Sequence, residues 1–441
     1  MNILFLAHRL PFPPNKGDKL RAFRHLKHLA SSHRVWCACF LDDPRDRLSV
    51  EPLSSYCHEL AAVPLSRTRA AIGGLWRFAL GGTLTEGAYD QPAMWNVVKE
   101  WISSVRFDLV WTFSSSMAPY ALTVPSDRRT LDLCDVDSAK WLGYAAAARS
   151  PLRWAFGAEG RRLRKLEIRW CHAFDSVVVI SEAEAALVRP KVDSGRIHVI
   201  SNGVDLPIYP LADSGGKPDR TANAATFPAP SKLSRPVVGF IGAMDYRPNV
   251  DAVTWFVETC WDSIRTCVPG VEFRIIGRNP TRRVRRLGRR AGVVVVGEVP
   301  LITSEVEKIR VSVAPMRLGR GLQNKVLEAM AHARPVVLTP LAAQGIEFTP
   351  GVHALVASNP ADFAESVCRL LLDGELADRV GLAGRDYVAQ FHPWTQQLAR
   401  VDHLLGHRPV GAIADASDPS DRIEWDAAVS RKTAGKEVSL V

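Results

Sequence analysis

Short apolar runs alternate with amphipathic segments in the first part of this chain. The apolar runs predict strands at residues 2–7, 34–40, 107–113, 129–133, 176–181 and 197–205. Between them, residues 19–30 carry apolar side chains at helical spacing, and residues 92–105 also have a helical pattern. Strands that alternate with helices form parallel sheets covered by helices. The first part of the chain is therefore expected to be a parallel α/β domain.

The same alternation returns after residue 236. One predicted strand ends at Gly242, and further strands are predicted at residues 271–277, 293–296, 311–315, 335–339 and 353–357. Helices are predicted from Asn249 onward and at residues 322–333, 362–372, 375–390 and up to about 405. A second parallel α/β domain is therefore expected.

The composition changes abruptly between the two parts, where residues 207–236 are rich in proline, glycine and small polar residues. Such a segment is typical of a flexible linker, and the polar end of the chain is typical of disorder. A length of 441 residues also favours two domains. We divide the chain into an N-terminal domain at residues 1–205, a linker at 206–235, a C-terminal domain at 236–390, a terminal helix at 391–408 and a tail at 409–441.

The composition is that of a globular protein, with 47% hydrophobic residues and no run near the ~20 apolar residues that span a bilayer. The first ten residues have no charged segment before their apolar run and no cleavage site, so they predict a buried strand and not a signal peptide. We therefore expect a cytoplasmic protein. The eight cysteines show no C-x-x-C spacing and indicate neither a zinc site nor a disulfide framework.

The formal net charge of +10 is clustered in two arginine-rich segments, at residues 161–170 and 282–290. Anionic partners are implied. No nucleic-acid recognition motif accompanies the charge, so a phosphorylated substrate or an anionic membrane surface fits better than nucleic acid. For residues 282–290 we favour a solvated helix face. Residues 70–82, apolar with arginines beside them, are either a segment lying on a membrane or a core helix, and we favour the core.

Residues 313–339 predict a strand, a glycine loop, a helix and a second strand. Such a unit directs a helix N-terminus at the carboxyl edge of a parallel sheet, where an anion is favoured. Gly319 and Gly321 let a phosphate approach the backbone. Lys325 and Glu328 lie three residues apart on one helical face. A nucleotide diphosphate with a ribose diol suits this combination.

Two further loops connect strands to helices. His8 directly follows the first strand, and the loop after it holds Gly17 and Asp18, which we expect to cap the helix at residues 19–30. The loop after Gly242 repeats the arrangement in the second domain, with Arg247 near the helix start.

Three carboxylates, Asp132, Asp135 and Asp137, are placed between a predicted strand end and a helix beginning near Ser138. A general base is expected among them, although one of the three is alternatively a helix cap. The Asp135-x-Asp137 pair is also a pattern that holds divalent metals elsewhere. We do not expect a metal, because hard cations need several oxygen ligands and the nucleotide pocket is predicted in the other half of the chain.

Three segments together resemble a known family: LAHRLPFPPNKGDKLRAFRHL, DLCDVDSAKW and GRGLQNKVLEAMAHARPVVLT. They resemble the retaining glycosyltransferases of the GT4 type, and especially the sugar transferases of bacterial exopolysaccharide synthesis associated with exosortase (PEP-CTERM) systems. The resemblance implies a GT-B fold, with two Rossmann-like domains facing a cleft and a C-terminal helix that crosses back to the first domain. It departs from the E-x7-E pattern of the family, because Arg320 occupies the position of the first Glu.

The resemblance also implies roles for individual residues. In the family, the position of Glu328 binds the donor ribose, Lys325 and Arg247 suit the diphosphate, and Glu298 lies in the turn that holds the base. The implied donor-binding set is Gly17, Gly242, Arg247, Glu298, Gly319, Arg320, Gly321, Asn324, Lys325 and Glu328. The acceptor hydroxyl is expected near His8, Asp135 and Asp137. The nucleotide sugar is a substrate, and no cofactor or metal is expected.

The sequence therefore predicts a transferase that moves a sugar, with retention, from a nucleotide sugar to a saccharide or lipid-linked saccharide, at or near the inner face of the cytoplasmic membrane. Two alternatives stay open. One is a GT-B protein that binds nucleotide sugar or polysaccharide without transfer, since Arg320 replaces a Glu. The other is a dinucleotide-dependent oxidoreductase, which is disfavoured because no G-x-G-x-x-G follows the first strand.

Overall fold

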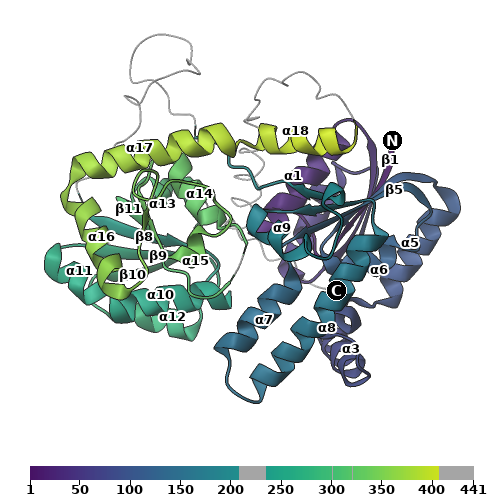
Figure 1. Ribbon diagram of the computed structural model, residues 1–441, viewed down its shortest axis with the longest axis horizontal. Helices are drawn as coiled ribbons and strands as arrows, with labels where there is room; N and C mark the ends of the chain where they lie inside the picture. The colour runs from purple at the N-terminus through teal and green to yellow at the C-terminus, as the bar shows by residue number, and fades with distance from the viewer. Residues whose placement is uncertain (208–234, 300, 320, 407–441) are drawn as a thin grey trace, which may run out of the picture. The chain divides into compact units, whose positions relative to one another are not determined.

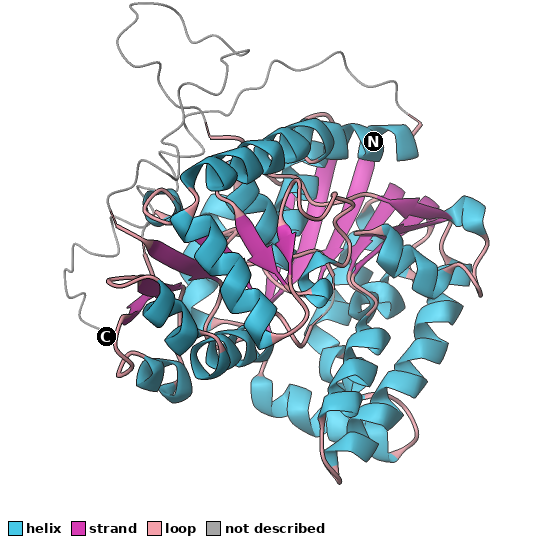
Figure 2. Ribbon diagram, turned by 60° about the vertical axis from the view of Figure 1, so that its left-hand side comes forward, coloured by secondary structure: helices cyan, strands magenta, loops and turns pink. Residues whose placement is uncertain are grey.

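The computed structural model describes residues 1–207, 235–299, 301–319 and 321–406. The described residues form two compact units, the first consisting mainly of Met1–Asn202 and the second mainly of the residues from Gly203 onward. The predicted linker lies almost entirely outside the described residues, and the predicted tail lies wholly outside them. Figure 2 shows the strands of each unit between helices.

The first unit contains a parallel sheet of seven strands in the order β3-β2-β1-β4-β5-β6-β7. The strands are β1 (Asn2–Ala7), β2 (Arg34–Leu41), β3 (Glu59–Pro64), β4 (Phe107–Phe113), β5 (Ser126–Cys134), β6 (Ser176–Val179) and β7 (Ile197–Val199). The helices are α1 (Gly17–Ala30), α2 (Val50–Ser54), α3 (Arg67–Ala79), α4 (Leu84–Tyr89), α5 (Pro92–Ser104), α6 (Ala118–Ala121), α7 (Asp137–Ala147), α8 (Leu152–Ala173) and α9 (Glu182–Val188), with 3-10 turns η1 (Pro44–Ser49), η2 (Ser115–Met117) and η3 (Ser194–Arg196).

The central strands of this sheet are buried on both faces, which explains why their sequences are continuous apolar runs and not alternating ones. All side chains from Ile3 to Ala7 are inaccessible to solvent. Leu4 and Leu6 pack into a core that also receives Val110 of β4 and Leu131 of β5.

The second unit contains a parallel sheet of six strands in the order β10-β9-β8-β11-β12-β13. Its strands are β8 (Val237–Ile241), β9 (Glu272–Ile276), β10 (Val293–Gly297), β11 (Val311–Ala314), β12 (Val336–Leu338) and β13 (Leu355–Val356). Its helices, labelled in Figure 1 where there is room, are α10 (Arg247–Thr259), α11 (Trp261–Cys267), α12 (Arg282–Leu287), α13 (Ile302–Val306), α14 (Asn324–Ala331), α15 (Pro340–Ala343), α16 (Pro360–Leu372), α17 (Gly374–Phe391) and α18 (Trp394–Leu404). That α18 crosses back to the first unit stays a prediction.

Two predictions about the first unit are wrong. Asp18 does not cap α1, because the helix begins at Gly17 with Lys16 in the capping position, and the Asp18 carboxylate forms an ion pair with Arg9 at 2.8 Å instead. The apolar segment at residues 70–82 is not a core helix. It forms most of α3, whose Leu75 and Trp76 side chains are 64% and 68% exposed.

The arginine-rich segment of the second unit forms the exposed helix face that the sequence favoured. Arg282, Arg283, Arg285 and Arg286 of α12 are all exposed. None of the described helices combines the length and the hydropathy that a bilayer crossing requires.

Candidate functional site

The carboxyl edge of the second sheet contains a point where the chain changes direction. From β8 the chain continues to β9 and β10 on one side, and from β11 it continues to β12 and β13 on the other. Since β8 and β11 are neighbours, the loops after them diverge, and such a switch point is where open α/β sheets bind ligands. The loop after β8 contains Gly242, and the loop after β11 contains Gly319 and Gly321.

The loop after β8 is packed closely against the backbone of the next strand. A Cβ atom on Gly277, at the end of β9, would lie 1.8 Å from the Gly242 carbonyl oxygen. No side chain is tolerated at that distance. The Asn249 amide, in the first turn of α10, donates to the Ala243 carbonyl at 3.0 Å. These contacts fix the backbone at Gly242, the predicted donor-binding glycine of this loop.

The loop after β11 has the left-handed turns that its glycines permit. Gly319 and Gly321 have φ values of +99° and +77°, which side chains rarely adopt. Arg320 lies outside the described residues. The loop leads into α14, whose N-cap residue Gln323 makes no side-chain capping bond. The first-turn N–H groups of α14, including that of Asn324, are thus not capped by the Gln323 side chain and face the carboxyl edge of the sheet.

Lys325 occupies the first turn of α14 and is held by groups from both sides of the switch point. Its ammonium donates to Asn249 Oδ1 at 2.9 Å and to Gln323 Oε1 at 3.3 Å. The ammonium also lies 4.9 Å from the centre of the Phe240 ring. Burial lowers the pKa of Lys325 to about 8, with the nearby Glu328 opposing the shift. The ammonium is therefore partly desolvated, which strengthens its attraction for an anion.

Glu328 follows Lys325 by one helical turn on the same face of α14. Burial raises the pKa of its carboxyl, while the Lys325 ammonium lowers it and the Asp205 carboxylate raises it further. The side chain remains partly exposed. A cation and a carboxylate thus lie on one face of α14, an arrangement that suits a ligand with both an anionic and a hydroxylated part.

Arg247 and Glu298 are the two further charged residues of the predicted donor set within the described residues. Arg247 is the first residue of α10 and its side chain is exposed. Glu298 is exposed and follows β10, the edge strand separated from β8 by β9. Both lie at the carboxyl edge of the sheet. Asn249 was missed as a site residue, because its sequence position indicates only a helix start.

The first sheet has its own switch point, between β1 and β4. His8, which follows β1, stacks on Phe113 at the end of β4 with ring centres 5.9 Å apart. Its Nε2 lies 3.5 Å from Asp18 Oδ2, and its Nδ1 is buried without a hydrogen-bond partner. Gly17 is exposed at the start of α1. His8 is thus held at the edge where the sequence placed it.

Asp18 and Arg9 form a charged pair beside His8 that the sequence did not indicate. The Arg9 guanidinium lies 2.8 Å from Asp18 and 3.7 Å from Asp42. Despite burial, the Arg9 cation and the His8 hydrogen bond hold the pKa of the Asp18 carboxyl far below its usual range. The loop after β1 is therefore rich in fixed charge.

Asp132 is a structural residue and not a general base. It lies inside β5, completely buried, and accepts from the Arg21 Nε at 3.0 Å. His25 Nδ1 lies 3.2 Å away. The same Arg21 donates to the Ile200 carbonyl at 2.8 Å. This buried network ties α1 to β5 and to the segment after β7.

Asp135 lies between β5 and α7, and Asp137 begins α7, so both follow the strand end as predicted. Burial raises the pKa of Asp135 to about 7, and the neighbouring Glu184 and Asp137 carboxylates raise it too. Its Oδ1 has no hydrogen-bond partner among the described residues. Asp137 is the first residue of α7 and accepts from Ser115 Oγ at 3.2 Å. Asp135 thus differs from Asp137 in having a buried carboxyl oxygen without a hydrogen-bond partner among the described residues.

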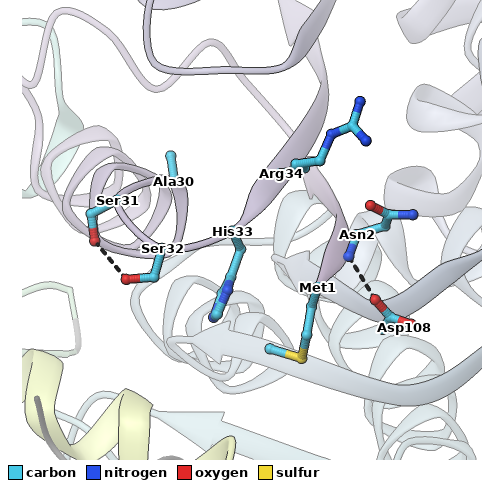
Figure 3. A pocket seen from close by; sticks show the side chains of 8 residues that line it. All are labelled: Met1, Asn2, Ala30, Ser31, Ser32, His33, Arg34 and Asp108. Atoms are coloured by element: carbon cyan, nitrogen blue, oxygen red, sulfur yellow. Dashed lines mark hydrogen bonds between the residues drawn. The ribbon is translucent and has the colours of Figure 1, made fainter.

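A cavity of about 570 Å³ lies away from these residues, and Figure 3 shows the side chains that line it. Asn2 begins β1 and Arg34 begins β2, and Asn2 donates its backbone N–H to Asp108 at 2.6 Å. The cavity is therefore at the amino ends of the strands. It lies opposite the edge that carries His8 and Asp135, and it is not part of the candidate site.

Comparisons with known proteins identify both units. Residues 20–207 match the family described as Glycosyltransferase Family 4, and residues 235–373 match the family described as Glycosyl transferases group 1. The chain belongs to the glycosyltransferases. These matches confirm the predicted enzyme class and the resemblance to GT4-type glycosyltransferases. The association with exosortase systems stays a prediction.

A curated relative of this glycosyltransferase is the alpha-maltose-1-phosphate synthase of Mycolicibacterium smegmatis, 26% identical over 241 residues. The alignment covers 50% of the chain and 60% of the relative, so the chain spans less than two thirds of that relative's length.

Solved glycosyltransferase structures share the fold. Sucrose-phosphate synthase from Thermosynechococcus elongatus superposes with a TM-score of 0.68 at 17% identity, covering 92% of this chain and 98% of that one. Anabaena HepE in complex with UDP-glucose has a TM-score of 0.62 at 15% identity, covering 92% and 99%. The predicted fold class, two Rossmann-like domains of the GT-B type, is confirmed.

Proposed function

We propose that this glycosyltransferase transfers a sugar, with retention, from a nucleoside diphosphate sugar to a hydroxyl group of a saccharide or lipid-linked saccharide. The observation that carries the proposal is the pairing of Lys325 with Glu328 at the switch point of the second sheet. The ammonium and the first turn of α14 suit a diphosphate, and the carboxylate suits the two ribose hydroxyls. The UDP-glucose complex of HepE, a protein of the same fold, supports a nucleotide-sugar donor.

Leaving-group stabilisation is proposed to come from the protein alone. As the glycosidic bond to the diphosphate breaks, negative charge grows on its oxygens. Lys325, held by Asn249 and Gln323, is in place before the reaction, and a preorganised donor of this kind is worth about 3–4 kcal/mol in other enzymes. Arg247 and Arg320 remain proposed donor contacts on the sequence resemblance.

The acceptor is proposed to bind on the first unit, beside His8 and Asp135. A carboxylate there orients or deprotonates the attacking hydroxyl. Asp135 suits the role because its pKa near 7 matches a base that works at neutral pH. An acceptor in exopolysaccharide or cell-envelope glycan synthesis, at the inner face of the cytoplasmic membrane, belongs to the same proposal, as does an association with exosortase systems.

The test is sugar transfer from a panel of UDP-, GDP- and ADP-sugars to lipid-linked and soluble saccharide acceptors, with the anomeric configuration of the product read by NMR. Transfer from one donor with retention is expected. Tight donor binding without transfer to any acceptor would instead favour a GT-B protein that only binds. Hydride transfer with a nicotinamide dinucleotide would favour the oxidoreductase.

Metal independence is tested in the same assay. Activity is expected to survive EDTA, because fixed cationic groups and the α14 N-terminus face the diphosphate. If EDTA stops transfer and Mg²⁺ or Mn²⁺ restores it, the Asp135-x-Asp137 pair becomes a candidate metal site.

A further inference from the structure

Helix α3 turns its apolar side chains outward. Its inner face is glycine: a Cβ atom on Gly73 would lie 2.5 Å from the Gly87 carbonyl oxygen, so α3 packs backbone to backbone on α4. The opposite face presents apolar residues at helical spacing, and Ile72, Leu75 and Trp76 are 63%, 64% and 68% exposed. A helix normally buries such a face. In α3, the buried face is instead the one formed by glycines.

The start of α8 extends this apolar surface. Leu152 and Trp154 are 57% and 65% exposed, and Trp154 makes an edge contact with Phe78 of α3 with ring centres 6.3 Å apart. The term outer patch is used below for one set of exposed side chains, those of Ile72, Leu75, Trp76, Leu80, Leu152 and Trp154. Figure 1 shows α3, α7 and α8 at one end of the first unit. Single exposed apolar residues are normal, whereas a patch of this kind marks an interaction site.

The outer patch is surrounded by positive charge. Exposed cations on α3 and α8 flank it: Arg67, Arg69, Arg77, Arg153, Arg161 and Lys165. Residues 66–85 and 138–158 contain no Asp or Glu. The nearest acid in α8, Glu159, is buried and accepts from the backbone N–H groups of Leu84 and Thr85. Arg77 lies 3.6 Å from the Glu86 carboxylate just beyond the first segment, so the positive charge at the rim comes mainly from the other five cations.

A cavity of about 300 Å³ adjoins the patch on α8. Its lining residues are Trp154, Ala158, Arg161, Arg162 and Lys165. The Arg162 guanidinium is occupied, since it donates to the Phe78 carbonyl at 2.7 Å and to the Gly82 carbonyl at 3.0 Å. Arg161 and Lys165 are exposed beside the indole of Trp154. An indole with two cations around a small concavity suits a phosphate headgroup with hydrocarbon next to it.

We propose that the outer patch docks this glycosyltransferase on an anionic lipid bilayer. Tryptophan and leucine on one face with arginine and lysine at the edges is the composition of helices that lie in the membrane interface. Charge complementarity selects an anionic surface over a neutral one. The inference extends the proposed function, since a lipid-linked acceptor is presented at such a surface, and the outer patch belongs to the unit that carries the proposed acceptor site.

The test is sedimentation of the full chain with vesicles of neutral phosphatidylcholine or of phosphatidylcholine with 30 mol% phosphatidylglycerol, without any substrate. Binding to the anionic vesicles is expected, with loss at high salt. Replacing Ile72, Leu75 and Trp76 by Ser should weaken binding at least tenfold. The matched control replaces Leu48, Val352 and Leu372 by Ser, three other exposed apolar residues, and should bind as the parent does.

The charge requirement has its own control. Arg161→Gln with Lys165→Gln should weaken binding at least fivefold, whereas Arg285→Gln with Arg286→Gln, the same change of charge on exposed α12, should not. Equal loss in both pairs would show a non-specific net-charge effect and overturn the assignment of the surface. Absence of vesicle binding by the parent, or a dimer that the Ser variants dissociate in ultracentrifugation, would also overturn it.

Vesicle binding and sugar transfer fail independently. Binding without transfer to any acceptor would refute the proposed function and leave the docking surface standing. Transfer to a soluble acceptor without vesicle binding would refute the docking surface and leave the proposed function standing. The Ser variants, whose changes are exposed, are checked for folding by circular dichroism and by unchanged turnover on a soluble acceptor.

Discussion

The Lys325 ammonium donates a hydrogen bond of 2.9 Å to Asn249 Oδ1, and so joins the first turn of α14 to the first turn of α10. The two residues are 76 positions apart in the sequence. Their contact spans the two loops that diverge at the switch point between β8 and β11.

Donor binding should depend on pH through Lys325. Burial lowers the pKa of this group to about 8, so the ammonium that attracts the diphosphate is lost as the pH rises through that value. Calorimetry on the parent should show the dissociation constant of the nucleoside diphosphate rising above pH 8. Lys325→Met should bind at least tenfold more weakly and lose that pH dependence, while Lys308→Met, a change at a half-exposed lysine, should retain it. If the affinity of the parent does not change between pH 7 and pH 10, Lys325 is excluded from the diphosphate site.

Glu328→Gln should weaken nucleotide-sugar binding ten- to hundredfold. The substitution replaces a charged acceptor for two ribose hydroxyls by a neutral amide, and a hydrogen bond to a charged group is worth about 1.5–3 kcal/mol. Glu258→Gln, an exposed change on α10, is the control and should not alter the affinity. Unchanged donor affinity in a folded Glu328→Gln variant would remove Glu328 from the site.

Asp135→Asn should lower kcat by about 10²-fold or more, the usual scale for general-base assistance, and should leave the donor affinity unchanged. The parent kcat should rise with pH and level off above the Asp135 pKa of about 7, and the variant should lack this limb. Asp137→Asn should instead lower the melting temperature with turnover preserved, because a carboxylate in the first turn stabilises α7. Near-parental turnover in both variants would direct attention to His8.

The same Asp135→Asn variant should be more stable than the parent at pH 8. The folded-state pKa lies above the ordinary value of 3.8, so folding opposes ionisation of this carboxyl. That cost grows as the pH rises from about 4 to 7 and then stays constant. Urea denaturation should therefore show that the variant is more stable than the parent at pH 8 and about equally stable at pH 4. Equal effects at both would contradict a buried ionised carboxylate.

Arg21→Met should destabilise the first unit strongly, since it leaves the Asp132 carboxylate buried without its cation. Loss of one partner of a buried ion pair costs about 3–5 kcal/mol. Burial opposes ionisation of Asp132, but the Arg21 cation and His25 lower its pKa below the ordinary value. The stability that this ion pair supplies is therefore present at a pH above the ordinary pKa of an aspartate, and it is lost as the pH falls through the pKa of Asp132 in the folded protein. The midpoint of urea unfolding at pH 7 measures the effect. Arg106→Met, at an exposed ion pair, should change it little.

Most strands were predictable from the sequence because buried parallel strands are continuous apolar runs, but the edge strand β3, at Glu59–Pro64, was not predicted and is mostly only half-buried. β1 and β4 match their predicted ranges, as Asn2–Ala7 and Phe107–Phe113. α1 was predicted only in part, since its inner face also buries Lys19, Arg21 and His25. The partner of Arg21 is 111 positions away. No local pattern distinguishes such a cation from a solvated one.

The site was predicted where chemistry is local and missed where it is long-range. Lys325 and Glu328 share one helix turn, so their spacing indicates a common face. Asn249 joins them only through the sheet order. The outward face of α3 was unpredictable for a related reason, because Gly73 and Gly87 replace side-chain packing by backbone contact, and an apolar helical pattern does not say which side is covered.

Helix α7 joins the proposed base to the outer patch. Asp137 is its first residue, and Ala147 at its other end comes shortly before Leu152 and Trp154. A helix of 11 residues is about 16 Å long, at 1.5 Å per residue. With the patch on a bilayer, the length of α7 limits how far above the lipid headgroups the transfer takes place. An acceptor is then selected by the distance between its membrane anchor and its hydroxyl group as well as by the identity of its sugar.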